Sequence, residues 1–386
     1  MVPVGGGGLR GTAKTGSLTG SASASARRRW VYVGSRTERP AQGEGISIYR
    51  MATSTGEWTL SEVVGGMVNP SFLALDRTGD CLYAVHGEPR DAITAFSIDR
   101  QSGGLRRLGD QPTETNPVHL AVDPSNSYIV VANGGANGGL ALFRIQAEGA
   151  LGPMCDLVHT YGKRGSGQVQ KPKSHPHHCP LDRSGQFVVV PDRDLDKVFV
   201  YRIDAVTGRL VVNDPPYAVS HPGAGPRHVD FHPTGPWAYV VNETDSTVTT
   251  YHFDTRNGAL TMLQTVPSLP PDFRGANTGA EIQVTPNGKF VYASNRGHDS
   301  LAIYAVDQSR GTLTPVGWEP TQGGKPRFFG IDPSGTFLYA ANEDGHTIVT
   351  FRIDQESGKP SPTGHVVKTG SPVCIVFGSE YEERPA

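Results

Sequence analysis

The sequence lacks the features of a membrane-bound, nucleic-acid-binding or disulfide-stabilised protein. Its 386 residues carry a net charge of −2 and a pI near 6.7, which gives no excess of positive charge to favour nucleic acid or an anionic membrane. The cysteines form no CxxC pair, and each lies in or near an apolar run: they are Cys81, Cys155, Cys179 and Cys374. We therefore expect four buried thiols in a reducing compartment, without disulfides or a cysteine-based metal site.

The first 29 residues have few apolar side chains. They are rich in Gly, Ser, Thr and Ala and end in Arg27-Arg28-Arg29, without the apolar run that an export signal requires. Such a composition cannot bury a core. We therefore expect a disordered low-complexity tail over residues 1–29, one folded domain over residues 30–386 and a cytoplasmic location.

Glycine and proline are abundant instead, with 48 and 30 residues, and they mark a repeated turn. Turns of the Asp-Pro-Ser-Gly type recur at 76–79, 123–126, 182–185, 232–235, 285–288 and 332–335. In such a turn the Asp side chain accepts backbone hydrogen bonds, Pro presets φ, and Gly or Asn adopts a positive φ. The spacing of about fifty residues indicates a repeat architecture.

Each turn is followed by three further strand patterns. A second strand such as FVYASN comes first, a third ends in a pattern such as TYHFD, and a Gly turn leads to a fourth. Four strands in about fifty residues are typical of a β-propeller blade. Six blades are complete, while residues 30–36 resemble a second strand and residues 371–378 a first strand. The fold predicted is all-β, a seven-bladed β-propeller with four antiparallel strands per blade. One blade is closed by the N- and C-terminal strands, which removes exposed sheet edges.

The topology locates a site at one mouth of the ring. Antiparallel pairing places the residues before each first strand beside those that follow the second strand, and ligand sites favour such concave mouths. The polar residues at these positions are His175, His177, His178, Asp192, Arg193, Arg227, Glu243, Glu281, Arg296, His298, Arg327 and Glu343. Structural roles are the alternative: a turn cap for His177, ion pairs between blades for the arginines and Glu243, a buried partner for Glu281, and turn formation for His298. Adjacent histidines in extended chain point to opposite sides, so we expect no metal at 175–178.

The segments PRHVDFHPTG, PNGKFVYASNR and NRGHDS resemble those of the seven-bladed lactonase propellers, over about residues 30–378. That group includes propeller-type 6-phosphogluconolactonases and a fungal carboxy-cis,cis-muconate lactonizing enzyme. The resemblance implies an active site of His177, Arg227, Glu243 and Arg296, although the adjacent His178 leaves the choice of histidine open. We expect His178, Glu281, His298 and Arg327 to bind substrate, with no cofactor and no metal.

These residues suit hydrolysis of an anionic lactone, most simply 6-phosphogluconolactone. Glu243 or His177 is the general base, and the arginines bind the anion and stabilise developing charge. No GxSxG motif is present, so we expect direct attack by water. Lys325, Arg327 and residues 163–173 are candidates for a phosphate site. Cycloisomerisation of a muconate and a non-catalytic binding scaffold are the alternatives. We expect a monomer.

Overall fold

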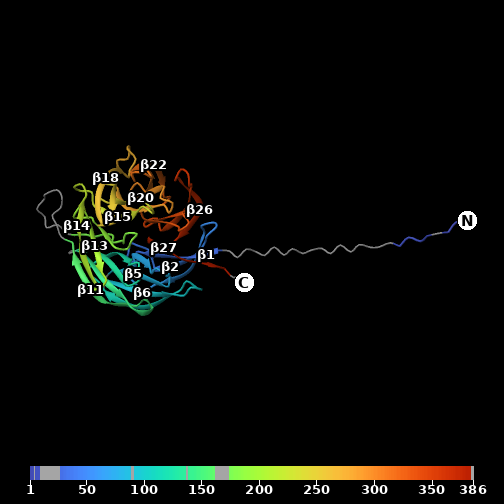
Figure 1. Cartoon of the computed structure of the whole chain (residues 1–386), viewed down its shortest axis with the longest axis horizontal. Helices are drawn as coiled ribbons and strands as arrows, with labels where there is room; N and C mark the ends of the chain where they lie inside the picture. The colour runs from blue at the N-terminus through green and yellow to red at the C-terminus, as the bar shows by residue number, and fades with distance from the viewer. Residues whose placement is uncertain (4, 9–26, 88–90, 136–137, 161–173, 384–386) are drawn as a thin grey trace.

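The computed structural model describes residues 1–3, 5–8, 27–87, 91–135, 138–160 and 174–383. Within them, nearly all regular structure is β-strand, apart from a 3-10 turn at Ala147–Gly149. Seven antiparallel sheets form the blades of a propeller (Figure 1). The predicted fold class is confirmed.

The blades are numbered here in chain order, each from its inner to its outer strand. Blade 1 comprises β4 (Phe72–Leu75), β5 (Cys81–His86), β6 (Ala92–Ile98) and β7 (Leu105–Pro112). Blade 2 comprises β8 (Pro117–Val122), β9 (Tyr128–Asn133), β10 (Gly139–Ile145) and β11 (Leu151–His159). Blade 3 has β12 (Val188–Asp192), β13 (Lys197–Asp204) and β14 (Arg209–Val219). Blade 4 comprises β15 (Pro226–Phe231), β16 (Trp237–Asn242), β17 (Thr247–Asp254) and β18 (Ala259–Pro267). Blade 5 comprises β19 (Thr278–Val284), β20 (Phe290–Arg296), β21 (Ser300–Val306) and β22 (Leu313–Pro320). Blade 6 comprises β23 (Pro326–Ile331), β24 (Phe337–Asn342), β25 (Thr347–Ile353) and β26 (Pro360–Lys368).

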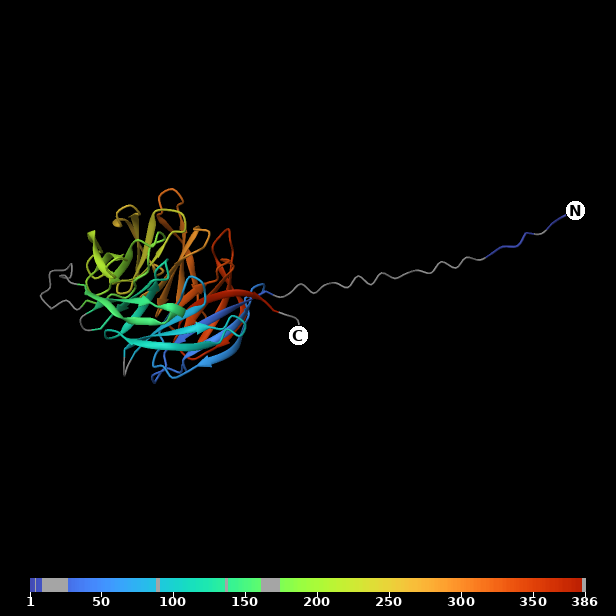
Figure 2. The ribbon, with the colours of Figure 1, turned by 60° about the horizontal axis from the view of Figure 1, so that its bottom comes forward.

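Blade 7 joins the two ends of the chain, as predicted. Its order is β27 (Pro372–Glu382), β1 (Arg27–Ser35), β2 (Ile46–Ala52) and β3 (Trp58–Val64). The first and last strands, blue and red, lie side by side in both views (Figures 1 and 2). Strand β1 begins three residues before the predicted domain start, because Arg27 pairs with Glu382. Most of the predicted tail, residues 9–26, lies outside the described residues.

The innermost segment of blade 3 is irregular. Residues 174–182 meet β12 in two isolated bridges, Pro176 with Asp192 and Leu181 with Val188. Proline has no N–H to donate to a sheet ladder, and Pro176 and Pro180 interrupt this segment. The His177 N–H still donates to Pro191 O at 3.0 Å. The histidines therefore sit on a kinked inner edge, where strict alternation of side chains does not apply.

The repeated turns have the predicted chemistry, and they are followed by a repeated contact between blades. In blade 6 the Asp332 carboxylate accepts the Phe337 N–H at 2.7 Å, and Gly335 has φ +72°.

On β16, the Tyr239 hydroxyl donates to Gly311 O of the neighbouring blade at 3.0 Å. Equivalent bonds run from Tyr32 to Gly103, Tyr83 to Gly149, Tyr292 to Gly358 and Tyr339 to Gly56. The last of these links blade 6 to blade 7 and so helps close the ring.

The core lies between the faces of adjacent blades. One cluster packs Val189 and Val200 of blade 3 against Val240 and Tyr251 of blade 4. Three cysteines are buried and all four are free thiols, but Cys155 is exposed. The prediction of four buried thiols was wrong there because Cys155 lies on β11, the outermost strand of its blade.

Candidate active site

The site begins with a break in register on the innermost strand of blade 4. Pro226 pairs with Asn242, but His228 pairs with the adjacent Val241, so Arg227 is an extra residue in β15. A β-bulge of this kind re-aims side chains that would otherwise alternate between faces. Arg227 and His228 consequently both line a central cavity, together with His177. The same shift at Pro326 and Phe328 brings Arg327 to the cavity from blade 6.

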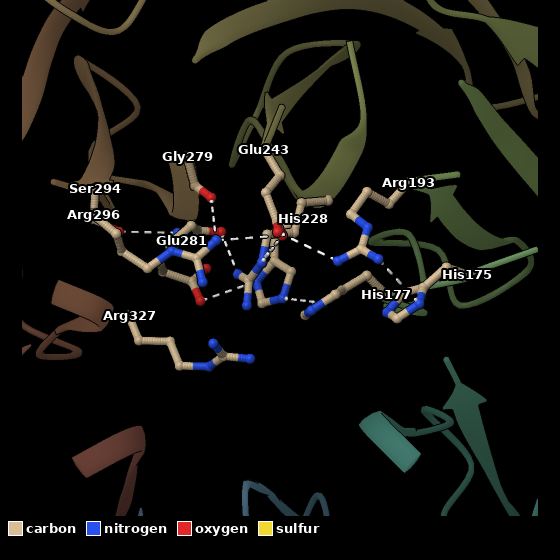
Figure 3. A network of polar contacts seen from close by, with 12 residues as sticks. His175, His177, Arg193, His228, Glu243, Gly279, Glu281, Ser294, Arg296 and Arg327 are labelled. Carbon is tan, nitrogen blue, oxygen red and sulfur yellow. Dashed lines mark hydrogen bonds and ion pairs between the residues drawn. The ribbon is translucent and has the colours of Figure 1, made fainter. Parts of the chain in front are cut away.

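Three guanidinium groups converge on the carboxylate of Glu243, which directly follows β16 (Figure 3). Arg227 Nε lies 3.0 Å and Arg296 Nη2 3.4 Å from Glu243 Oε2. Arg193 Nη1 lies 3.4 Å from Glu243 Oε1. These residues come from three blades, 3, 4 and 5. The ring closure therefore builds a shared ion network with more guanidinium groups than carboxylates.

The network fixes both the charge and the orientation of its members. Burial has the largest single effect on the Glu243 pKa and raises it, but these three arginines and Arg327 together outweigh burial and hold that pKa below its usual value. Arg296 donates to Gly279 O at 3.0 Å, and Arg227 donates to Ala280 O. Two successive carbonyls of β19 thus hold two guanidinium groups against one ionised carboxylate.

A second polar chain runs inward from the cavity. His177 Nδ1 lies 3.1 Å from His228 Nε2, and His228 Nδ1 lies 3.0 Å from Glu281 Oε2 (Figure 3). All three side chains are buried. Burial, reinforced by the charge of Arg227, holds the pKa of His177 and of His228 well below the usual range. Burial raises the pKa of Glu281 to about 8, against the opposing effect of Arg227.

His178 lies in the wall behind this chain. Its ring stacks on His228 at 4.2 Å between centroids and meets His119 edge-on at 3.9 Å. Its Nδ1 accepts the Val229 N–H at 3.3 Å, so its tautomer is fixed by the backbone. Burial lowers its pKa to about 3, with Arg227 contributing. Of the two adjacent histidines, the cavity is lined by His177.

His298 also has partners of its own. Its ring Nδ1 lies 2.6 Å from Ser300 Oγ, and its backbone N–H donates to Asn277 Oδ1 at 3.0 Å. The imidazole ring packs edge-on against Phe273. Of the predicted site residues, His177, Arg227 and Arg327 line the cavity, whereas His178, Glu243, Glu281, Arg296 and His298 are not part of its lining. Glu243 and Arg296 reach it through Arg227, which shares the Glu243 carboxylate with Arg296. Contact of Glu281 and His298 with substrate stays a prediction.

Arg327 belongs to a second cluster of cations around Glu343, which follows β24 as Glu243 follows β16. The Glu343 carboxylate lies 3.4 Å from Lys325 Nζ, 3.6 Å from Arg36 Nε and 3.8 Å from Arg327 Nη1. The last two distances exceed hydrogen-bond length. Arg36 and Arg327 both line the cavity. Their guanidinium groups are therefore positioned to bind an anion there.

His228, His119 and Arg36 were missed by sequence reasoning. His228 was not among the predicted residues, because a neighbour of Arg227 in a regular strand is expected to face the opposite way. The signal was the triplet that opens several inner strands, a proline followed by any residue and then His or Phe, as in Pro117–His119, Pro226–His228 and Pro326–Phe328. Each triplet carries the register shift.

The described residues contain no group of three or more His, Cys, Asp or Glu side chains arranged to hold a metal ion. Nor does any helix within those ranges have the length and apolarity to cross a membrane. The side chains joined in the two polar networks described above are those of arginine, glutamate and histidine.

Comparison with known proteins assigns the family. Residues 30–377 match the family described as "Lactonase, 7-bladed beta-propeller". The chain belongs to this lactonase family. A 6-phosphogluconolactonase of Bacillus subtilis is 33% identical over 309 residues, which cover 78% of this chain and 84% of that protein. A 6-phosphogluconolactonase of Formosa agariphila is 32% identical over 313 residues, covering 78% of this chain and 86% of the relative.

Solved structures extend the likeness to the whole propeller. A periplasmic gluconolactonase of Pseudomonas aeruginosa superposes with a TM-score of 0.84 at 28% identity, covering 91% of this chain and 99% of that one. A putative 6-phosphogluconolactonase of Bacteroides fragilis gives 0.83 at 30% identity, covering 91% and 98%. The family resemblance inferred from the sequence is confirmed.

Proposed function

We propose that this protein hydrolyses a sugar-acid lactone, 6-phosphogluconolactone to 6-phosphogluconate, by direct attack of water. One observation carries the proposal: three arginines share the carboxylate of Glu243 beside a neutral histidine that faces the cavity. Family membership and relatives named as lactonases for this substrate support it. Neither the cycloisomerase nor the scaffold alternative has a comparable observation in its favour.

Each group has a distinct role in this reaction. Ester hydrolysis places negative charge on the carbonyl oxygen, and positive groups held in advance where that charge develops lower the barrier. Arg227 and Arg296 supply that charge, and Glu243 keeps their guanidinium groups in place. Glu243 itself is a weak base because the arginines lower its pKa. His177 is therefore the base that activates water, since its Nδ1 is bonded to His228 and its Nε2 remains for the cavity.

The phosphate group of the substrate is assigned to Arg36 and Arg327. Guanidinium groups form bidentate hydrogen bonds with phosphate oxygens. Both side chains line the same cavity as Arg227 and His177. Lys325 is exposed on the outer side of Glu343 and adds charge without lining the cavity. Residues 163–173, the other predicted phosphate candidates, lie outside the described residues.

We further propose a monomeric enzyme in the cytoplasm. Three buried free thiols suit a reducing compartment, and pairing of β27 with β1 in blade 7 leaves neither terminal strand unpaired for a second copy to extend. Size-exclusion chromatography with light scattering tests the first statement, and fractionation of the source cells tests the second. A stable dimer, or activity in an exported fraction, would overturn the corresponding statement.

The function is tested by incubating the protein in parallel with 6-phosphogluconolactone, gluconolactone and a carboxymuconate. Ring opening is followed by acid release, with the uncatalysed rate subtracted. We expect rapid opening of the phosphorylated lactone, slower opening of gluconolactone and no cyclisation of the muconate. A rate equal to the uncatalysed one for both lactones would overturn the proposal.

A further inference from the structure

A continuous hydrogen-bonded path leads from the cavity to a buried carboxyl group. It starts at His177, which lines the cavity, passes through His228, and ends at Glu281 on β19. Glu281 is 4% exposed and does not line the cavity. Its other oxygen, Oε1, accepts the N–H of Ile282 at 3.0 Å, which fixes the carboxyl orientation. Two imidazole rings in series therefore separate this carboxyl from the reacting water.

His177 alone is a poor proton acceptor. Burial and the positive charge of Arg227 both oppose its imidazolium form, as the strongly lowered pKa shows. The same two effects act on His228. A general base works best when its pKa lies near the working pH. Either His177 is not the general base, or the proton that it takes from water moves on to another group.

We propose that Glu281 is the final proton acceptor of the hydrolysis, and that His177 and His228 relay the proton to it. This rests on the lactonase function proposed above. The attacking water gives a proton to His177 Nε2, and the resulting hydroxide bonds to the lactone carbonyl carbon. His177 passes its Nδ1 proton to His228 Nε2, and His228 passes its Nδ1 proton to Glu281 Oε2. The carboxylate becomes a carboxylic acid, and neither imidazole remains charged. The proton returns along the path in reverse to the alkoxide that leaves when the ring opens.

The protonation state of Glu281 decides what His177 presents to the cavity. An ionised Glu281 accepts a hydrogen bond from His228 Nδ1–H, His228 Nε2 then accepts from His177 Nδ1–H, and His177 Nε2 is a free lone pair. A protonated Glu281 donates instead, every bond in the chain reverses, and His177 presents an N–H. The ionised form is therefore the one that activates water.

The surroundings of Glu281 keep its pKa in the working range. From β15, the positive charge of Arg227 favours the ionised form, while Asp230 opposes it. From β20, Ser294 Oγ accepts the Glu281 N–H at 3.0 Å. From β27, the buried thiol of Cys374 is close enough to interact electrostatically with Glu281. Burial raises the pKa of this thiol. Burial is the largest influence and raises the pKa of Glu281 to about 8.

Charged groups also surround the cavity end of the path. His175 and Arg193 from blade 3, Arg227 from blade 4 and Arg327 from blade 6 all disfavour a proton on His177. The pKa of His175 is itself lowered to about 4, by burial first and then by Arg193. Above pH 6 these neighbours keep a constant charge. Burial raises the pKa of Asp230, the charged neighbour of Glu281, only to about 6, so a change of rate centred near pH 8 reports on Glu281.

The first test uses the unmodified enzyme. We expect kcat/KM for 6-phosphogluconolactone to rise nearly tenfold per pH unit up to an apparent pKa near 8 and then to level. We also expect a plot of the rate against the fraction of deuterium in the solvent to be curved, because several protons move in the same step. Transfer of a single proton would give a straight line. Hydrolysis with a pH-independent rate from 6 to 9 and a linear deuterium dependence would overturn the relay. That outcome would leave the proposed function standing, whereas no hydrolysis at any pH would overturn the function itself.

The second test replaces Glu281 by glutamine. In Glu281→Gln the amide oxygen stays on the Ile282 N–H, so the NH₂ group faces His228 and fixes His177 as a donor. We expect kcat/KM to fall by about 10²- to 10⁴-fold at pH 8, with loss of the rise toward pH 8. A uniform fall that keeps the pH profile indicates a structural role only and would overturn the proposal. The matched control is Glu319→Gln, at a half-buried glutamate on β22 outside the cavity lining, which should leave the rate unchanged.

Discussion

His178 and His228 stack face to face, with ring centroids 4.2 Å apart and an angle of 11° between their planes. They come from neighbouring blades, and His119 from a third blade packs edge-on against His178. Burial holds the pKa of all three rings below the usual value, with His178 at about 3. Three histidines whose neutral form is favoured thus pack together on the inner segments of blades 2, 3 and 4.

This cluster predicts instability in acid. Below about pH 6.5 these histidines bind protons in the unfolded chain but stay neutral in the folded protein. The stability of the folded protein above pH 6.5 is therefore lost as the pH falls toward 3. Each such histidine contributes up to about 1.4 kcal/mol per pH unit. Urea unfolding between pH 7.5 and 4.5 measures the slope. His178→Phe should reduce the slope of the unfolding free energy against pH by the equivalent of one proton bound on unfolding. An unchanged slope would show that His178 titrates normally in the folded protein.

Replacing Arg296 by alanine should impair the reaction without unfolding the protein. The side chain is 9% exposed, donates to Gly279 O, and shares the Glu243 carboxylate with Arg227, which lines the cavity. Loss of one group that stabilises the developing oxyanion costs about 10²- to 10³-fold in kcat. Steady-state kinetics with far-UV circular dichroism check this. Arg256→Ala, at an exposed arginine paired with Asp254 in its own turn, is the control and should behave as wild type. An unchanged kcat/KM in Arg296→Ala would remove that residue from the mechanism.

Arg327→Ala should separate phosphorylated from unphosphorylated lactones. A hydrogen bond to a charged group is worth about 1.5–3 kcal/mol, which corresponds to roughly 10- to 100-fold in affinity. We expect KM for 6-phosphogluconolactone to rise by that factor, while KM for gluconolactone stays the same. Parallel kinetics on the two substrates measure the difference. An equal rise for both lactones would contradict the assignment of Arg327 to the phosphate.

The tyrosine bonds between blades predict specific losses of stability. Tyr239→Phe leaves the buried Gly311 carbonyl without its donor and should cost about 1–3 kcal/mol. Gly311→Ala should cost more, because φ is +73° and the added Cβ would lie 2.3 Å from the Trp237 ring. Gly364→Ala is the matched control: φ is +88°, but nothing lies within 4 Å. Urea unfolding compares them, and equal costs for the two alanine variants would contradict the packing argument.

Much of the fold could be predicted because its information is local and repeated. Six Asp-Pro-Ser-Gly-type turns and the strands between them determine four-stranded blades, and the unpaired strands at residues 30–36 and 371–378 determine the closure. The position of Glu243 followed from the same topology, since it directly follows a second strand. Its three guanidinium partners come from separate blades, so only the assembled ring shows that they share one carboxylate.

What could not be predicted depends on departures from regular strands. The bulge at Arg227 turns His228 toward the cavity, and the prolines around His177 break the alternation in blade 3. A period-two pattern places His228 on the face opposite to Arg227, and it leaves the choice between His177 and His178 open. The contact between Glu281 and His228 was likewise hidden, because it joins residues 53 positions apart.

A crystal of the Glu281→Gln variant soaked with 6-phosphogluconate tests most directly whether the arginine-lined cavity is the lactonase site. The product carboxylate should lie on Arg227 and Arg296, and its phosphate on Arg36 and Arg327, with His177 Nε2 facing the carboxyl carbon. Product bound elsewhere on the propeller, or bound without those arginines, would contradict the assignment.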